Sequence, residues 1–456
     1  MTAALPKSML FAFPSDIAVD LLCHWIDVFD LVRLEMSITS VTIRPEFLGL
    51  LRQLPGISTI SDHFSGNLII NQWAIQRNIR VSSVDINESF FNEDGEFRLS
   101  LALNQIQHIS VQFFLSNNIK EHIHPLLSSC SSLKSVTFDD IVALEDVSSE
   151  VLNRLNVLHV SNLGRNDVFL DNIARYCQHL TSLQLLLNTD TYDLSRILRS
   201  NPALTYLEVV APQSKLNLLL KQYPALQSVT FHIAEAVSLP MLVESLRLRP
   251  DLKHLEVESD INTFFISNKI GKKSVHLYFG YELVAESEVV SFLSLIRNVN
   301  DLYFGTEVTA PFDAVFDWIV EQSRTSLTRL DLRNIPTEFV MSIVGKLSSL
   351  TDLTWSSLED PCSDVPELRK LRYLRWSIWL TLAHLCTLLT MCQNVVEASL
   401  YLQLTDDELD SWVSIISDKL SHIALVEFTV LSGVKNAYSK CQFRHGQYID
   451  ANPESV

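Results

Sequence analysis

A short apolar pattern recurs along most of this chain of 456 residues and constrains its fold more than any other feature. The pattern is an apolar residue, two variable residues, a second apolar residue, one variable residue and a third apolar residue. Clear copies begin at Leu133, Leu155, Leu180, Leu204, Leu226, Leu252, Val299, Leu327, Leu350 and Leu371. Outside the interval from Leu252 to Val299, successive copies begin 21–28 residues apart. One copy arises easily by chance, but a series at this spacing predicts an internal structural repeat.

The second half of each period has the spacing of an amphipathic helix. Apolar residues at positions i, i+3, i+4 and i+7 make one stripe on a helix. Such sets are Leu170/Ile173/Ala174/Cys177, Leu216/Leu219/Leu220/Tyr223, Val289/Phe292/Leu293/Ile296 and Leu385/Leu388/Leu389/Cys392. Pro202, Pro224 and Pro250 each stand two residues before the next triplet, where a proline ends a helix because it lacks an N–H group. Each period therefore predicts a short strand followed by a helix.

Weaker copies of the triplet at Val81, Ile106 and Val395, and one near Val275, extend the array to residues 81–430. The unit resembles the leucine-rich repeat of the ribonuclease-inhibitor-like branch. The resemblance implies an α/β solenoid, a horseshoe with a concave parallel sheet and convex helices, in which each repeat buries its apolar face against its neighbours. The Asn or Cys that this family often places after the strand is replaced here by residues such as Ile141. We therefore expect irregular repeats whose turns are held in another way.

The segment 8–51 lacks the triplet and predicts a small cluster of short helices. It contains Phe13-Pro14, Asp16-Ile17 and a second helix opening at Asp30. This small all-α unit resembles an F-box, although no tryptophan closes the motif. The resemblance implies binding to a Skp-type linker protein of a cullin ubiquitin ligase through apolar residues. Those residues are Phe13, Pro14, Ile17, Leu21, Leu22, Leu31 and Leu34.

A second interpretation of the same helices stays open. An open end of a solenoid must be covered, and a helical cap needs the same apolar pattern. Residues 52–80 are interpreted as a connector or capping segment. Residues 431–456 are polar and lack the repeat, and we expect a frayed tail there.

The variable positions inside the triplets point away from the core of a sheet, so they line the expected concave face. Among them are acidic, basic and aromatic residues, which suit recognition of a protein because Tyr and Arg are frequent anchors. The predicted partner-binding residues are Glu208, Glu256, Glu258, Tyr303, Asp331, Arg333 and Arg375. Each one singly is also compatible with an ordinary solvated strand position.

Composition limits the kinds of function. The formal net charge of −18 disfavours nucleic acid and anionic membranes as partners. Seven cysteines without a CxxC motif suit reduced thiols, and the N-terminus is a poor secretory signal, so we expect the cytoplasm or nucleus. No phosphate-binding loop, nucleophile elbow or metal-ligand spacing is present in the sequence. We predict no catalytic residues, no metal and no cofactor.

These features predict a protein-interaction module. The preferred interpretation is a substrate-recognition adaptor of a cullin-type ubiquitin ligase, which binds a Skp-type linker protein through its N-terminal helices and an unidentified protein substrate on the concave face. The alternative is a leucine-rich-repeat scaffold or inhibitor without a ligase link, in which the N-terminal helices only cap the solenoid.

Overall fold

The computed structural model covers the whole chain and divides into two compact units, Met1–Val210 (unit 1) and Ala211–Val456 (unit 2). It describes residues 17–19, 22, 28–38, 43–54, 56–58, 67–87, 90–91, 103–111, 117–138, 147–161, 167–188, 192–234, 236–259, 262–269, 272–280, 285–306, 312–335, 340, 343, 345–356, 370–391, 394–405, 408, 412–420, 423–432, 437–444 and 447–449.

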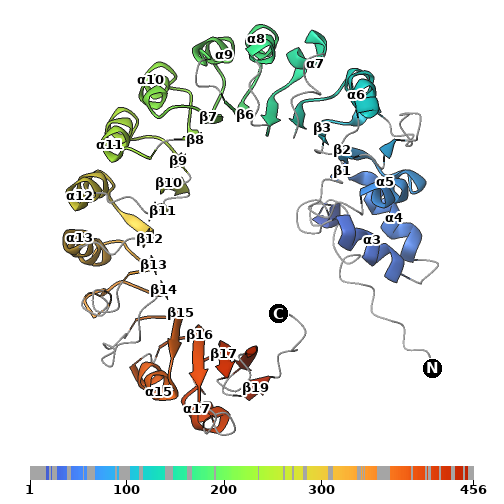
Figure 1. The fold of residues 1–456 in the computed structure, drawn as a ribbon. Coiled ribbons are helices and arrows are strands. Elements are labelled where there is room, and N and C mark those ends of the chain that lie inside the picture. Colours follow the sequence, from blue (N-terminus) through green and yellow to red (C-terminus); the bar gives the residue numbers. More distant parts are fainter. Residues whose placement is uncertain are drawn as a thin grey trace, which may run out of the picture. The chain divides into compact units, whose positions relative to one another are not determined.

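Unit 1 begins with helices and continues as alternating strands and helices. Its elements are α3 (Val28–Ser37), α4 (Ile43–Gln53), β1 (Ile57–Ser58), α5 (Asn67–Gln76), β2 (Val81–Ile86), the 3-10 helix η2 (Leu103–Gln105), β3 (His108–Val111), α6 (Asn117–Ser129), β4 (Ser135–Phe138), α7 (Ser149–Arg154), β5 (Val157–Val160), α8 (Asp167–Tyr176), β6 (Ser182–Asn188), α9 (Ser195–Ser200) and β7 (Tyr206–Val210). The strands pair in parallel in chain order. Helices α6–α9 lie on one side of strands β3–β7 (Figure 1).

Unit 2 repeats the alternation with one interruption. Its elements are α10 (Ser214–Gln222), β8 (Ser228–His232), α11 (Leu239–Leu248), β9 (His254–Glu258), β10 (Asn262–Lys269), β11 (Lys272–Phe279), α12 (Glu286–Ser294), β12 (Val299–Thr306), α13 (Asp313–Ser323), β13 (Arg329–Arg333), β14 (Asp352–Ser356), β15 (Tyr373–Leu380), α15 (Leu382–Met391), β16 (Glu397–Leu404), α17 (Trp412–Leu420), β17 (Leu425–Ser432), β18 (Ala437–Arg444) and β19 (Gln447–Ile449). The pairs from β11 to β17 and the pair β8–β9 are parallel. Here too the helices occupy one side of the sheet (Figure 1).

The apolar triplets form the core in register, as the repeat predicts. In unit 1, Leu158 pairs with Leu183, which pairs with Leu207, and all three are buried. In unit 2 the corresponding pairs join Leu330 to Leu302 and Leu353. Burying each such side chain stabilises the fold by about 1.5–3 kcal/mol. The chain is therefore an α/β leucine-rich-repeat solenoid, which confirms the predicted fold class.

Turns between helices and strands are held by long polar side chains at one recurring position, directly before the proline of the repeat. The buried Asn201 amide donates to the carbonyl oxygens of Cys177 and Ile197 at 2.8 and 2.9 Å and accepts from the Leu180 N–H at 2.9 Å. In unit 2, the guanidinium of Arg249 donates to the Leu226 carbonyl oxygen at 2.7 Å. These bonds satisfy buried turn groups that would otherwise destabilise the fold. These bonds hold the turn before the strand, and the expectation about the turn after the strand stays a prediction.

The interruption in unit 2 is an antiparallel hairpin. Strand β10 pairs with β9 on one side and β11 on the other, and no helix separates the three strands. On the core side, the ring of Phe264 lies edge-on to Phe279 and Phe292 at centroid distances of 5.4 and 6.0 Å. From α11 to α12 the sheet advances three strand steps, from β8 to β11, or about 14 Å, whereas packed helices lie about 8–10 Å apart. The sheet therefore needs less curvature here than in the strand–helix repeats.

The N-terminal helices share one core with the first strands. Leu22, Leu31, Phe47 and Leu51 belong to the same buried cluster as Trp73 of α5, and the cluster continues through Ala74 and Ile79 to Val81 of β2. The helices therefore cover the first repeat, and no separate core divides residues 17–58 from the start of the array within the described part of unit 1.

The C-terminal segment differs from the expected frayed tail. Strand β18 pairs antiparallel with β17, and β19 pairs antiparallel with β18. The described residues of 431–456 thus continue the sheet. Alternation is limited to the four residues Lys440-Cys441-Gln442-Phe443, so the sequence signal for a strand is short.

Candidate functional site

The face of the sheet without helices, called the open face, carries three rows of side chains across unit 2. The rows are defined by strand register, so residues of one row lie side by side on neighbouring strands. The first row is Ser228, His254, Ser267, Ser274, Asp301, Arg329, Asp352, Tyr373 and Glu397. The middle row is Thr230, Glu256, Phe265, His276, Tyr303, Asp331, Thr354, Arg375, Ser399 and Glu427. The third row is His232, Glu258, Thr263, Tyr278, Gly305, Arg333 and Ser356.

A continuous line of rings, the aromatic strip, crosses strands β9–β12 and consists of His254, Phe265, His276 and Tyr303. Ring centroids are 4.9 Å apart for His254 and Phe265, 4.7 Å for Phe265 and His276, and 5.5 Å for the stacked pair His276 and Tyr303. The guanidinium of Arg333 lies 5.1 Å from the Tyr303 centroid and ends the strip with a cation–π contact. The stack holds the rings in fixed positions on the surface.

Gly305 leaves room for two neighbouring tyrosines, Tyr278 and Tyr303. A Cβ atom at this position would lie 3.1 Å from Tyr278 and 3.2 Å from the hydroxyl of Tyr303. A side chain here would push these two tyrosines apart. The sequence shows the residue as one of only 11 glycines, without a turn motif around it.

Carboxylates border the aromatic strip and contact histidines. The Glu256 carboxylate lies 3.4 Å from Nε2 of His254, and the Glu258 carboxylate lies 3.2 Å from Nδ1 of His232. Burial lowers the pKa of His276 below its ordinary value, although the nearby Asp331 and Asp301 act in the opposite direction. His276 is therefore mostly neutral at pH 7 and acts here as an aromatic ring.

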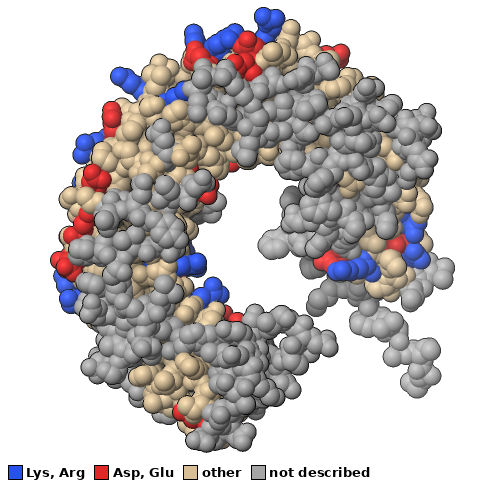
Figure 2. Space-filling model, in the orientation of Figure 1, with Lys and Arg blue, Asp and Glu red and all other residues tan. Residues whose placement is uncertain are grey.

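A pocket of about 250 Å³ lies next to the aromatic strip on strands β13–β17. Its floor is formed by Leu353, Leu374 and Ala398, and its polar lining comprises Arg329, Asp352, Thr354, Tyr373, Arg375, Glu397, Ser399 and Glu427. Arg329 and Arg375 are exposed and form no ion pair with any residue that the structure describes. Figure 2 shows basic side chains on this strand side of unit 2. Both signs of charge can therefore be recognised within one pocket.

Of the residues predicted to bind a partner, unit 2 brings six onto one face. Tyr303 contacts Arg333, whose Nε lies 3.4 Å from the Asp331 carboxylate, and Arg375 lines the adjacent pocket. Glu256 and Glu258 border the aromatic strip. Glu208 lies in unit 1, where the Tyr206 hydroxyl donates a hydrogen bond to its carboxylate. Whether these residues bind a partner stays a prediction.

Sequence reasoning missed His254, Phe265 and His276, three of the four rings in the strip. The triplet search left the interval from Leu252 to Val299 almost empty because β10 runs antiparallel and has no helix after it. A usable signal existed: two runs of alternating residues flank Ile270-Gly271, and a two-residue connection containing Gly is typical of a hairpin. Lys269 pairs with Lys272, as such a connection requires.

Four of the seven predicted linker-binding residues are described. Ile17 is 45% exposed, Leu34 is half-buried, and Leu22 and Leu31 are buried in the core shared with β2. Phe13, Pro14 and Leu21 lie outside the described residues. Met36, which the sequence did not single out, is 71% exposed on α3.

A buried carboxylate ties α3 to α4 and α5. The Glu35 side chain is fully buried and accepts hydrogen bonds from Nε of Arg44 at 2.8 Å, Nε of Arg77 at 3.3 Å and Nε1 of Trp73 at 3.4 Å. Burial alone would raise the pKa of Glu35, but the bonds from Arg44 and Trp73 and the charge of Arg77 together lower it. The ion cluster therefore stabilises the packing of the N-terminal helices on the first repeat.

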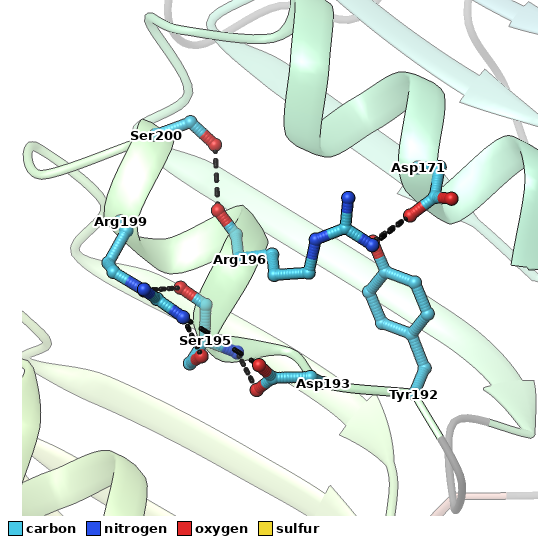
Figure 3. A network of polar contacts seen from close by, with 7 residues as sticks. All are labelled: Asp171, Tyr192, Asp193, Ser195, Arg196, Arg199 and Ser200. Atoms are coloured by element: carbon cyan, nitrogen blue, oxygen red, sulfur yellow. Dashed lines mark hydrogen bonds and ion pairs between the residues drawn. The ribbon is translucent and has the colours of Figure 1, made fainter.

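A second polar network lies on the helix side of unit 1 (Figure 3). The Tyr192 hydroxyl and the Arg196 guanidinium both donate to the Asp171 carboxylate on α8, and Arg199 donates to the hydroxyl of Ser195 at 2.7 Å. Burial raises the pKa of Tyr192, and its bond to Asp171 adds to the effect. The contacts join α8 to the start of α9, so we assign this network to repeat packing.

Reactive groups are scarce in the described part of the chain. The structure places no group of three potential metal ligands there. Burial raises the pKa of the Cys130 thiol to about 11 and that of Cys177 to about 12, so both thiols stay protonated and unreactive. Among the described helices, none is long and apolar enough to cross a bilayer.

Comparison with known proteins gives little further information. No protein-family model matches the chain, and no curated protein matches it. Among solved structures, the chain is similar to a chain in the crystal structure of the Rad7 and Elc1 complex from yeast. The TM-score is 0.38 and the identity 16%, over 86% of this chain and 88% of that chain. A similarity of this size does not transfer function.

Proposed function

We propose that this protein is an interaction module that binds a protein partner on the open face of unit 2. The observation that carries the proposal is the aromatic strip ending at Arg333. Tyr and Arg dominate binding energy at protein interfaces, and rings that are already stacked lose little entropy on binding. The proposed function is binding alone and involves no reaction catalysed on the partner.

The test is affinity capture with the intact chain and with the double variant Phe265→Ala/Tyr303→Ala. A matched control, Leu218→Ala/Ile415→Ala, removes two exposed apolar side chains from helices α10 and α17 of the same unit. We expect partners that are recovered with the intact chain and the control and that are at least about tenfold reduced with the strip variant. Equal recovery with all three proteins would contradict the proposal.

We further propose that the module is an adaptor of a cullin-type ubiquitin ligase that binds a Skp-type linker protein through its N-terminal helices. Support comes from the resemblance of residues 8–51 to an F-box and from the exposed apolar side chains of Ile17 and Met36. The burial of Leu22 and Leu31 in the core shared with β2 favours the alternative, a helical cap on a scaffold protein. A cytoplasmic or nuclear location remains a prediction.

A pull-down with a purified Skp-type linker protein separates these two candidates. The adaptor proposal predicts binding by the intact chain, loss of binding in Ile17→Asp/Met36→Asp, and retained binding in Val168→Asp, which alters a side chain that is 68% exposed on α8. No binding by the intact chain, under conditions in which an established F-box protein binds, leaves the cap as the function of these helices.

A further inference from the structure

The open face over strands β8–β12 carries negative charge that no Lys or Arg of its three rows balances. The charged residues of these rows are Glu256, Glu258 and Asp301. The carboxylates of Glu256 and Glu258 contact histidines, and Asp301 accepts a hydrogen bond from the Ser274 hydroxyl at 3.1 Å. Lys269 and Lys272 pair with each other two residues outside the rows, and Arg329 of β13 is the register neighbour of Asp301. The negative charge without a Lys or Arg beside it in the register therefore lies at Glu256 and Glu258, where the face attracts positive charge.

The dimensions of this area fit a helix of a partner. The three rows span four residue steps along a strand, about 13 Å, and β8 to β12 span four strand steps, about 19 Å. A helix is about 10–12 Å wide, and about 13 residues of helix cover 19 Å. The face of a sheet offers no free backbone groups, so an extended segment would leave its own N–H and C=O groups without protein partners. A helix satisfies these groups internally.

The rings provide the apolar contact. Phe265 and Tyr303 are only partly buried. Beside Phe265 the first and third rows hold Ser267 and Thr263, and beside Tyr303 they hold Asp301 and Gly305, with Tyr278 next to Gly305. An apolar stripe at i, i+3, i+4 and i+7 can lie along this line of rings.

We propose that strands β8–β12 bind a basic amphipathic helix of a protein partner. Its apolar stripe packs on the aromatic strip, and its Lys or Arg side chains lie opposite Glu256 and Glu258. This inference rests on the proposed function, because it assigns the chemistry of the partner to the same face. It predicts both the secondary structure and the charge of the segment that is bound.

The test uses a phage-displayed library of helical peptides of roughly 18 residues with randomised surface positions, selected on the intact chain. Peptides that lose binding in Tyr303→Ala are the ones that bind the strip. We expect these to be enriched in Lys and Arg relative to the unselected library. We also expect at least about tenfold weaker binding to Glu256→Gln/Glu258→Gln.

The matched control is Glu288→Gln/Asp317→Asn, which removes the same charge from exposed positions on α12 and α13. Peptides attracted only by the net charge of the chain would weaken equally in both variants, and that result overturns the inference. Recovery of neutral or acidic strip-dependent peptides, or of none, also overturns it. The capture experiment with natural partners has its own outcome, so the proposed function can stand when this inference fails.

Discussion

Strands β4–β7 of unit 1 and strands β9–β12 of unit 2 both bury apolar side chains on the helix side of the sheet but present different open faces. The middle row of unit 1 reads Thr137, His159, Gln184 and Glu208, whereas unit 2 has Glu256, Phe265, His276 and Tyr303. The interior positions are fixed by packing between repeats, while the outward positions are free to vary. This difference is the reason for proposing a binding site on the open face of unit 2, while unit 1 is the more regular array.

The largest expected effect tests whether the two interiors are equivalent. Leu207→Ala in β7 and Leu255→Ala in β9 each remove a buried side chain of the triplet. Both should lower the free energy of unfolding by about 2–5 kcal/mol, because a cavity forms where neighbouring repeats interdigitate. Urea denaturation measures the free energy of unfolding of the whole chain. Hydrogen exchange of the strand amides measures the stability of each unit separately. A difference of more than about 3 kcal/mol between the two variants would break the equivalence.

The next effect concerns the turns, where the two units use different residues at one position of the repeat. Asn201→Ala leaves the buried Leu180 N–H without its acceptor, and we expect a loss of about 2–3 kcal/mol. Arg249→Lys keeps the charge beside Asp251 but cannot reproduce the fork that also reaches the Leu226 carbonyl oxygen. Unfolding of both variants in urea tests this point, and an unchanged midpoint for Asn201→Ala would disprove the role of the bridge.

A smaller effect is expected at the start of unit 1, where an ion cluster around Glu35 holds the helices together. The end of unit 2 is held instead by the antiparallel strands β17, β18 and β19. Glu35→Gln should lower the free energy of unfolding by about 1–2 kcal/mol, since Arg44 and Arg77 are partly exposed and can turn to water. The folded pKa of Glu35 lies below its ordinary value of 4.5, so its ionised form stabilises the fold at neutral pH. That contribution is lost as the pH falls below 4.5 through the lowered pKa.

The pH dependence provides the measurement. The difference in unfolding free energy between the unaltered protein and Glu35→Gln should shrink as the pH is lowered from 4.5 through the lowered folded pKa of Glu35. A difference that stays constant as the pH falls below 4.5 would show that the substitution acts through packing alone. The conservative change Arg33→Gln, at an exposed Arg33–Asp30 pair on the same helix, is the control and should have little effect.

The sequence predicted the repeated interior of both units because strand and helix periods are local properties. Leu158, Leu183 and Leu330 occupy the core positions that the triplet assigns to them. The hairpin strand β10 escaped this reasoning because it runs antiparallel to its neighbours and carries no apolar triplet within Asn262–Lys269. Strands β18 and β19 were missed because the segment was judged by its polar composition.

The candidate site was predicted only in outline. Tyr303 and Arg333 were correctly placed on the outward side of their strands, but the contact between them depends on the register of β12 with β13 and on the absence of a side chain at Gly305. The pocket joins side chains from β13 to β17, which are about a hundred residues apart in sequence. The spacing of the repeats alone does not predict which side chains so far apart in sequence will line one pocket. For the N-terminal helices, the pattern gave the apolar residues but not which of them face inward.

The smallest expected effect is the loss of stability from changing the open faces themselves. Gln184→Ala in unit 1 should alter the free energy of unfolding by no more than about 0.5 kcal/mol, because a solvated outward position contributes little. Tyr303→Ala removes a ring stacked on His276 and covered by Arg333, so we expect a loss of about 0.5–1.5 kcal/mol. Partner capture should fall sharply for Tyr303→Ala and stay unchanged for Gln184→Ala. If Tyr303→Ala instead costs as much as Leu255→Ala, the ring belongs to the core of the repeat, and the contrast between a fixed interior and a variable face fails at this strand.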